Sequence, residues 1–367
     1  MFASDRAKAR TGGFGSLSAA KIYQLFVPLL LIAIGHGVLI REREARTLGA
    51  LLSQGITGPQ ILIGKGLALF GAGFLLSLPA LFLSSHALMQ GEALGIGLGM
   101  YLTYLLFLFL WVSLILFFSS KVKTRGLALG GLLIVWFASS LIIPRIGVAA
   151  TSALMPMDGK FQTDMKMTGD IRALGDGHNA SDPAFAKLKA NILSQYNVDS
   201  VESLPINFRG VTAEFNEQEL TDVMNRYAEV RMQGEIKQSR ILKTLSIISP
   251  YLAIDNASRH LSGTDLATHH RFMREAEDVR FGFVQGLNKL HITELTYADD
   301  KKRSSDAASE KRTRISADNW ALLDDFRFKP DPASSRFSRA AFSIFSLMLW
   351  SLILLSAAII SARRIAP

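Results

Sequence analysis

The sequence contains no cysteine, and only 19% of its 367 residues are charged. The missing cysteine excludes disulfides, thiolate metal sites and cysteine nucleophiles. The low charge, against about 25% in a typical soluble domain, goes with 49% hydrophobic residues and a mean hydropathy of +0.25. The apolar residues fill 22–157 and 340–362. This segregation excludes a purely cytosolic protein and predicts a membrane bundle with one soluble insert.

The net charge of +9 is also unevenly distributed. Residues 151–338 hold 25 basic and 27 acidic side chains, whereas the rest of the chain holds 15 and 4. Nucleic-acid binding would need the basic excess on the soluble part, so we expect no nucleic-acid partner. Lysine and arginine at the ends of apolar segments are typical of membrane topology instead.

Five stretches without Asp, Glu, Lys or Arg are long enough to span a bilayer, which takes about 20 apolar residues. They cover residues 22–40, 66–91, 93–120, 126–144 and 340–362. We therefore predict an α-helical integral membrane protein with five visible transmembrane helices. The uncharged interior of these helices also disfavours an ion-coupled carrier, which needs a carboxylate near the middle of the membrane.

Basic residues set the expected orientation. They gather in loops 41–65 and 121–125 and in tail 363–367, whereas the hairpin near residue 92 carries only Glu92. The positive-inside rule places these basic segments in the cytoplasm, for a multi-pass protein of a bacterial inner membrane. The predicted organisation is an N-terminal periplasmic segment (1–21), a transmembrane bundle (22–148) with a cytoplasmic coupling helix (42–60), a periplasmic domain (149–338), the last transmembrane helix (339–362) and a cytoplasmic tail (363–367).

The N-terminus does not suit this orientation. Arg6, Lys8, Arg10 and Lys21 would have to be translocated, although no apolar leader precedes them. We expect that a first span is missing from this sequence. The alternative is a protein whose N-terminus lies outside.

The insert is predicted to be mainly α. A period of 3.6 residues predicts helices over 216–248 and from Thr264 or Asp265 to 290. Shorter helices are predicted at 183–193 and, near the membrane surface, at 249–263. Glycine and aspartate predict loops with short strands in 158–182, and residues 299–314 are expected to be mobile and solvated.

No motif for nucleotide or metal chemistry is present. The stretch from Gly58 to Gly64 is one residue too long for a phosphate-binding loop, and Gly66 replaces the required Ser or Thr. His260, His269 and His270 match no usual ligand spacing. We therefore expect no enzyme activity, no catalytic residue, no metal and no cofactor in this chain.

One titratable group lies well inside a predicted span. His36 stands between Gly35 and Gly37, about one turn from the predicted cytoplasmic end. The glycines favour a helix-packing role, because they permit close approach of a neighbouring helix. A proton relay is the alternative.

The segment after the first span carries the most specific pattern. An Arg-Glu-Arg-Glu run is followed by Thr47-Leu48, by Leu51-Leu52-Ser53 with Gly55, and by Ile61-Leu62 with Gly64-Lys65 before the next span. These residues predict an amphipathic helix over 42–60. An ordinary interfacial helix anchored by arginine is the alternative interpretation.

This pattern resembles the ABC-2 type permeases of ABC transporters. A second set of residues resembles the subgroup with a large periplasmic insertion before the last span: Ser249-Pro250, Ser258, Gly263-Thr264-Asp265, His269, Phe272, Ala276-Glu277, Arg280 and Leu287-Asn288. In that family each subunit has six spans with both ends cytoplasmic, so this sequence lacks the first. The resemblance covers nearly the whole chain.

The resemblance implies a permease subunit that pairs with a second permease, identical or a sister subunit, among membrane lipids. Separate ABC ATPase subunits would bring ATP and Mg and drive translocation, which we expect to be export. The implied ATPase-coupling residues are Glu42, Arg43, Glu44, Arg46, Thr47, Leu48, Leu51 and Leu52. Two alternatives remain: a mechanotransmitting ABC subunit that moves its periplasmic domain, and a membrane-anchored periplasmic scaffold protein.

Overall fold

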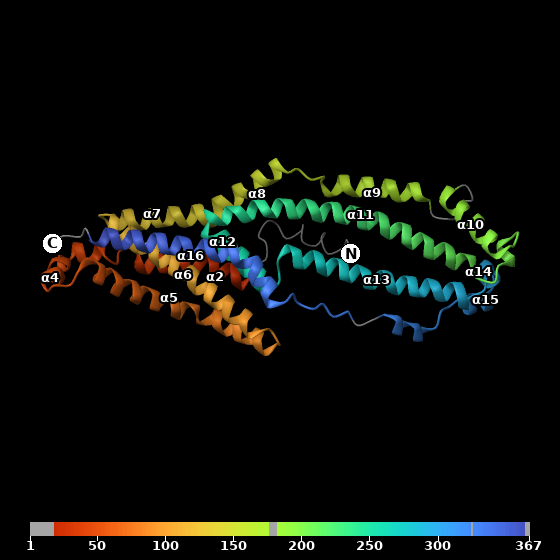
Figure 1. Ribbon diagram of the computed structural model, residues 1–367, viewed down its shortest axis with the longest axis horizontal. Coiled ribbons are helices and arrows are strands. Elements are labelled where there is room, and N and C mark those ends of the chain that lie inside the picture. Colours follow the sequence, from red (N-terminus) through yellow and green to blue (C-terminus); the bar gives the residue numbers. More distant parts are fainter. Residues whose placement is uncertain (1–17, 176–181, 324–325, 364–367) are drawn as a thin grey trace. The chain divides into compact units, whose positions relative to one another are not determined.

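The computed structural model describes residues 18–175, 182–323 and 326–363, and every regular element in these ranges is a helix (Figure 1). The chain divides into two compact units. Unit 1 comprises Met1–Leu154, Gln238–Asp265 and Pro330–Pro367, and unit 2 comprises Met155–Lys237 and Leu266–Lys329. Most of the predicted N-terminal segment (1–21) and of the tail (363–367) lies outside the described residues.

Among the described residues, five helices are long and apolar enough to cross a membrane, and all of them belong to unit 1. They are Ala19–Glu44, Gly58–Met89, Leu94–Lys121, Arg125–Leu154 and Ala333–Arg363. The first contains α2 (Ala19–Gly35) and α3 (Ile40–Glu44), and the next two are α5 (Gly58–Met89) and α6 (Leu94–Lys121). The fourth contains α7 (Arg125–Phe137) and α8 (Ile143–Leu154), and the last is α16 (Ala333–Arg363). The predicted helical architecture is confirmed, and the five candidate membrane-spanning helices are consistent with the five predicted spans.

The core of unit 1 is built around α6. This helix contacts α2, α5, α7 and α16, and its Phe107, Trp111 and Ile115 are fully buried. By contrast, α5 and α7 expose large apolar side chains such as Phe82, which is 72% exposed. Exposing this much apolar area to water is unfavourable, so these surfaces suit contact with lipid or with another membrane helix.

The fourth span continues past its predicted end at residue 144. The turn Ala138–Ile142 is π-helical and joins α7 to α8, which runs to Leu154. Pro144 has no backbone N–H and its ring would collide with the carbonyl four residues earlier in a regular helix. The wider turn relieves that collision, so proline bends the hydrogen-bonding pattern without ending the helix.

The helix α12 (Pro250–Ser262) lies inside unit 1, although the sequence placed it in the 149–338 domain near the membrane surface. Ser249 caps it, accepting from the Leu252 N–H at 3.1 Å and donating to the Ser139 carbonyl at 2.7 Å. Ala253, Ile254, Ala257 and Leu261 are fully buried, and α12 contacts α2, α6 and α16. The amphipathic pattern was read correctly, but the apolar face meets the spans.

Buried polar contacts join α12 to two spans. The Gln24 amide donates to the Tyr104 hydroxyl at 3.0 Å, and that hydroxyl lies 3.0 Å from the Ser258 hydroxyl. A second connection joins the α5–α6 hairpin to α16. There the Arg336 guanidinium, with a side chain only 3% exposed, lies 2.8 Å from the Glu92 carboxylate.

Unit 2 contains two long helices, α11 (Phe208–Thr244), whose last residues belong to unit 1, and α13 (Leu266–Glu294). Acidic residues of α11 meet basic residues of α13 in antiparallel order. The pairs are Glu235 with His270 at 2.7 Å, Glu229 with Arg274 at 2.6 Å, and Glu217 with Arg280 at 2.7 Å. In the part of the chain that the structure describes, both clusters of buried apolar residues lie in unit 1. Unit 2 combines these charge pairs with individual buried apolar residues such as Val223 and Met232.

Residues 158–182 differ from the predicted loop with strands. Helix α9 (Lys160–Leu174) occupies most of this stretch and is followed by α10 (Pro183–Tyr196), which was predicted. Asp170, interpreted from the sequence as a loop residue, accepts from Arg226 at 3.1 Å and from Tyr227 at 2.9 Å. Polar contacts hold α9 in place. Its sequence therefore lacks the apolar stripe from which a helix would have been predicted.

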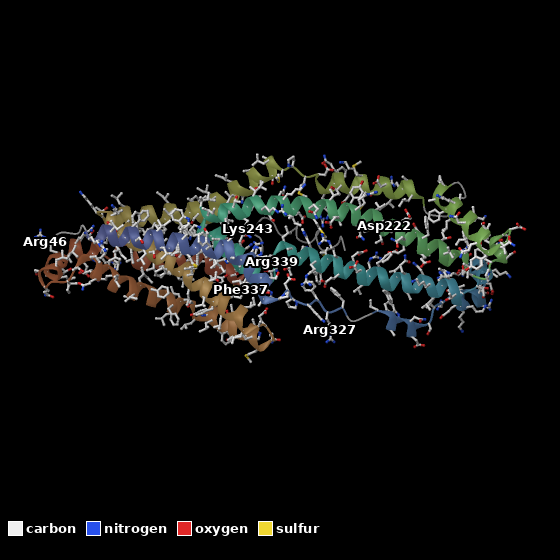
Figure 2. The ribbon with its side chains drawn as sticks, viewed as in Figure 1. Arg46, Asp222, Lys243, Arg327, Phe337 and Arg339 are labelled. Atoms are coloured by element: carbon white, nitrogen blue, oxygen red, sulfur yellow. The ribbon has the colours of Figure 1, made fainter. Side chains whose placement is uncertain are left out.

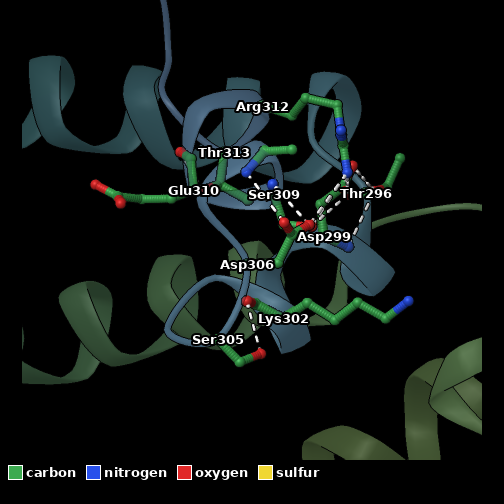
Figure 3. A network of polar contacts seen from close by, with 10 residues as sticks. Thr296, Asp299, Lys302, Ser305, Asp306, Ser309, Glu310, Arg312 and Thr313 are labelled. Atoms are coloured by element: carbon green, nitrogen blue, oxygen red, sulfur yellow. Dashed lines mark hydrogen bonds and ion pairs between the residues drawn. The ribbon is translucent and has the colours of Figure 1, made fainter.

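Residues 299–314, predicted to be mobile, form α14 (Tyr297–Lys302) and α15 (Ala307–Arg312) with a dense polar network (Figure 3). Arg312 donates to Asp299 at 2.6 Å, and Ser309 donates to Asp306 at 2.7 Å. The Arg312 guanidinium, together with the Thr296 hydroxyl, lowers the pKa of Asp299 to about 2. Side-chain hydrogen bonding orders this segment where apolar periodicity is absent.

Candidate functional site

The predicted coupling helix over 42–60 is not one helix. Helix α3 ends at Glu44, α4 covers Thr47–Ser53, and α5 begins at Gly58. Arg46 lies between α3 and α4 with φ 55°, in the left-handed region, and Gly55 has φ 85° between α4 and α5. We call residues 40–59 the coupling segment. It makes two sharp turns at the end of unit 1 that carries the basic loops, which we call the basic end.

The charged residues of α3 bond to three neighbouring spans. The Glu42 carboxylate lies 2.6 Å from the Lys65 ammonium of α5, and also accepts from the Thr47 hydroxyl. Arg43 donates to the Ser120 carbonyl of α6 at 3.0 Å. Glu44 pairs with Arg125 at the start of α7. Three of the predicted coupling charges therefore fix the segment to the bundle.

The three leucines of the predicted docking face also pack inward. Leu48 is only 7% exposed and belongs to the core cluster of unit 1. Leu51 and Leu52 are half-buried and pack against the same cluster. The sequence correctly identified an apolar face, but in this conformation the face stabilises the bundle and is not free for a partner.

The coupling segment offers both polar and apolar groups to a partner. Arg46 is exposed and extends from the basic end (Figure 2), and Ala50 and Gln54 are exposed too. A recess of about 600 Å³ lies beside them, lined by Leu52, Ser53, Gly55, Ile56, Thr57, Gly58, Pro59 and Arg363. Thr57 caps α5, with its N–H donating to Gln60 at 2.8 Å. The exposed surface and the recess can receive a protruding element of another protein.

Three basic residues are further functional candidates. The sequence indicated Arg125 and Arg363 only as topology markers, and Lys65 also as part of the pattern before the next span. Each contacts or lines the coupling segment. A signal was available: a run of alternating charges at the end of an apolar helix attracts opposite charges from neighbouring loops. The basic loops were the nearest source.

Gly35 and His36 behave as a packing site. A Cβ atom on Gly35 would lie 2.6 Å from the Leu69 side chain, so a larger residue would force that side chain to shift where α2 approaches α5. The His36 ring nitrogen Nδ1 lies 3.1 Å from the Ile32 carbonyl of its own helix. The helix-packing role predicted from the glycines agrees with this geometry.

The histidines near residue 265 bind carboxylates. His260 lies 2.5 Å from Asp265, and His270 lies 2.7 Å from Glu235. His269 and His270 are neighbours whose ring centroids are 6.3 Å apart. Over the described ranges, no group of three or more His, Asp or Glu side chains is arranged to hold a metal ion.

Part of the chain resembles a known protein family. Residues 161–329 match a family described as a domain of unknown function, DUF3526. The match covers most of unit 2 together with α12 and is less than half of the chain. No curated protein and no solved structure matches the chain.

Proposed function

We propose that this chain is the membrane-spanning permease subunit of an ABC-2 type ABC transporter. In this proposal a separate ATPase subunit binds the coupling segment, and ATP hydrolysis drives translocation of a substrate between two permease subunits, in the direction of export. The sequence pattern of residues 40–65 and the subgroup pattern from Ser249 to Asn288 support it. Five apolar helices are consistent with it.

The coupling segment is the observation on which the proposal rests. A partner that pushed on its exposed surface would move several helices together, because α3 is bonded to α5, α6 and α7. A rigid-body shift of this kind is a common route by which a small displacement becomes a large one. In this proposal the ion pairs of Glu42 and Glu44 connect the coupling segment to the bundle, whereas Arg46 contacts the ATPase.

This division of roles separates binding from coupling. In the proposed complex Arg46 pairs with an acidic residue of the ATPase. Arg46→Glu would place a like charge there and should weaken association at least tenfold, a change of about 1.4 kcal/mol or more. Glu44→Ala should leave the ATPase bound but lower its coupling to transport, since the segment loses its link to α7. Both effects can be measured on a tagged chain purified from its native membrane.

Arg172→Glu, on an exposed position of α9, is the matched control and should change neither quantity. Loss of ATPase association in the control, or unchanged association in Arg46→Glu, would contradict the assignment. If no ATPase subunit co-purifies with the unaltered chain, the proposal fails outright.

A mechanotransmitting subunit, which moves unit 2 and not a substrate, is a second candidate. The observation that favours it is the separate unit of residues Met155–Lys237 and Leu266–Lys329, organised by charge pairs. Deleting this unit should abolish the output of a mechanotransmitter while leaving nucleotide hydrolysis intact. In an exporter, by contrast, substrate should still stimulate hydrolysis.

A further inference from the structure

Helix α16 joins two features at opposite ends of unit 1. At its C-terminal end Arg363 lines the recess beside the coupling segment. Near its N-terminal end lies Arg339, in the second turn of the helix. A helix of 31 residues is about 46 Å long and moves as a stiff rod. A displacement of α16 at the recess is therefore delivered to Arg339.

The Arg339 guanidinium bridges two carboxylates. Its Nε lies 3.0 Å from Asp265 Oδ2, and its Nη2 donates to Asp331 Oδ2 at 2.7 Å. The Asp265 side chain is only 4% exposed and also lies 2.5 Å from His260 Nδ1. Arginine suits this place because its planar fork can bind two separate acids at once, whereas lysine offers a single point charge.

The place of these acids in the chain gives the contact its meaning. Asp265 is the last residue of unit 1 before the chain enters unit 2, and Asp331 is the second residue after it returns. In addition the Lys243 ammonium, five residues after the start of Gln238–Asp265, donates to the Arg339 carbonyl at 3.2 Å. Figure 2 labels Lys243 and Arg339. At three of the four places where the chain passes between the units, a nearby side chain therefore contacts Arg339.

The position of Arg339 has an electrostatic requirement. Arg339 lies just past the first turn of α16, where the helix dipole gives a cation no stabilisation, so its charge depends on nearby anions. Asp265 and Asp331 supply two such anions within 3.0 Å. The two carboxylates and the guanidinium therefore stabilise one another. Moving either the segment with Asp265 or the segment with Asp331 away from Arg339 would leave a charge poorly compensated.

We propose that Arg339 is the positioning residue through which a displacement of α16 moves the two chain segments that bear Asp265 and Asp331, and so moves unit 2. This inference rests on the proposed function, because it takes the partner ATPase as the source of the displacement. In this proposal α16 transmits a displacement from the recess to the chain segments that bear Asp265 and Asp331.

The test uses the full chain in complex with its ATPase subunit, purified from the native membrane. Because the chain has no cysteine, Gln90→Cys in unit 1 and Asp222→Cys in unit 2 give two unique sites for spin labels. The distance between the labels is measured by pulsed electron paramagnetic resonance, once without nucleotide and once with Mg-ATP and vanadate. Arg339→Met is compared with Arg259→Met, a control that removes a half-exposed arginine paired with Asp255.

The unaltered chain and the Arg259→Met control should show a nucleotide-dependent shift in the distance. Arg339→Met should lose more than half of this shift while nucleotide hydrolysis stays within twofold of the unaltered complex, and Arg339→Lys should lie between. If Arg339→Met fails to fold, Asp331→Asn replaces it, with the same loss expected.

The possible failures are distinct. A full shift in Arg339→Met or Asp331→Asn overturns the role of Arg339 and leaves the proposed function standing. The absence of any nucleotide-dependent shift in the unaltered complex overturns the role of Arg339. If that complex also contains no ATPase subunit, the proposed function fails with it.

Discussion

The ion pair between Glu92 and Arg336 allows a quantitative test of how unit 1 is held together. At 2.8 Å and an effective dielectric constant of about 20, the gross attraction is about 6 kcal/mol. Most of this offsets desolvation, so the informative change is removal of one partner. Glu92→Gln would leave a guanidinium that is 3% exposed without an opposite charge, with only neutral acceptors such as the Leu261 carbonyl at 3.2 Å. We expect a loss of about 3 kcal/mol, the lower end for a broken buried pair.

The opposite change should be milder. Arg336→Met leaves Glu92, whose side chain is 26% exposed and can be solvated, so we expect a loss of about 1 kcal/mol. The double variant Glu92→Gln/Arg336→Met removes both charges and should return the stability to within about 1 kcal/mol of the original. The coupling free energy in this double-mutant cycle is therefore about 3 kcal/mol.

Unfolding of unit 1 can be followed by tryptophan fluorescence in detergent. A Trp320→Phe background leaves Trp111, Trp136 and Trp350, all of which belong to unit 1. Additive losses in the double variant, or a Glu92→Gln loss no larger than that of Arg336→Met, would refute the reasoning.

Three further predictions concern single contacts. Gly210→Ala should destabilise unit 2 by roughly 1–3 kcal/mol, because its Cβ would lie 2.7 Å from a backbone nitrogen of α13, whereas Gly282→Ala has open space and should be neutral or stabilising; amide exchange of α13 distinguishes them. The pKa of Asp299 is lowered to about 2, below its ordinary value of about 3.9, so its contribution is present above pH ~4 and is lost as the pH falls toward 2. The stability gap between Asp299→Asn and the unaltered chain should thus close in acid; an equal gap at pH 6 and pH 2.5 would argue against the pairing. Ser249→Ala should lower stability by about 1–2 kcal/mol through loss of the α12 cap and of a buried hydrogen bond, with Ser262→Ala as an exposed control expected to change little in thermal melting.

The five spans could be predicted from the sequence because the constraint is strong and local. A bilayer requires about 20 consecutive apolar residues, and one charge is enough to interrupt the pattern. The long helices α11 and α13 were predicted for a related reason, since their periodicity extends over many turns. What periodicity cannot give is the partner of an apolar face, so α12 was assigned to the insert although it packs on α6 and α16.

The coupling segment shows the other limit. Its charges and leucines were identified, but the break at Arg46 has no sequence signal, because arginine has no preference for the left-handed conformation found there. The ion pairs of Glu42 and Glu44 with Lys65 and Arg125 depend on how distant helices approach one another. Helix α9 and the α14–α15 segment were missed because polar contacts, and not an apolar stripe, hold them.

The most direct test of the account is cross-linking from the coupling segment. Gln54 is exposed beside the recess, and in a chain without cysteine Gln54→Cys provides a unique thiol for a photoreactive label. In native membranes we predict that this label captures an ABC ATPase subunit, whereas a label at Arg172→Cys does not. Capture of no nucleotide-binding protein from position 54, together with reaction of that thiol with a membrane-impermeant reagent added from outside, would contradict the account.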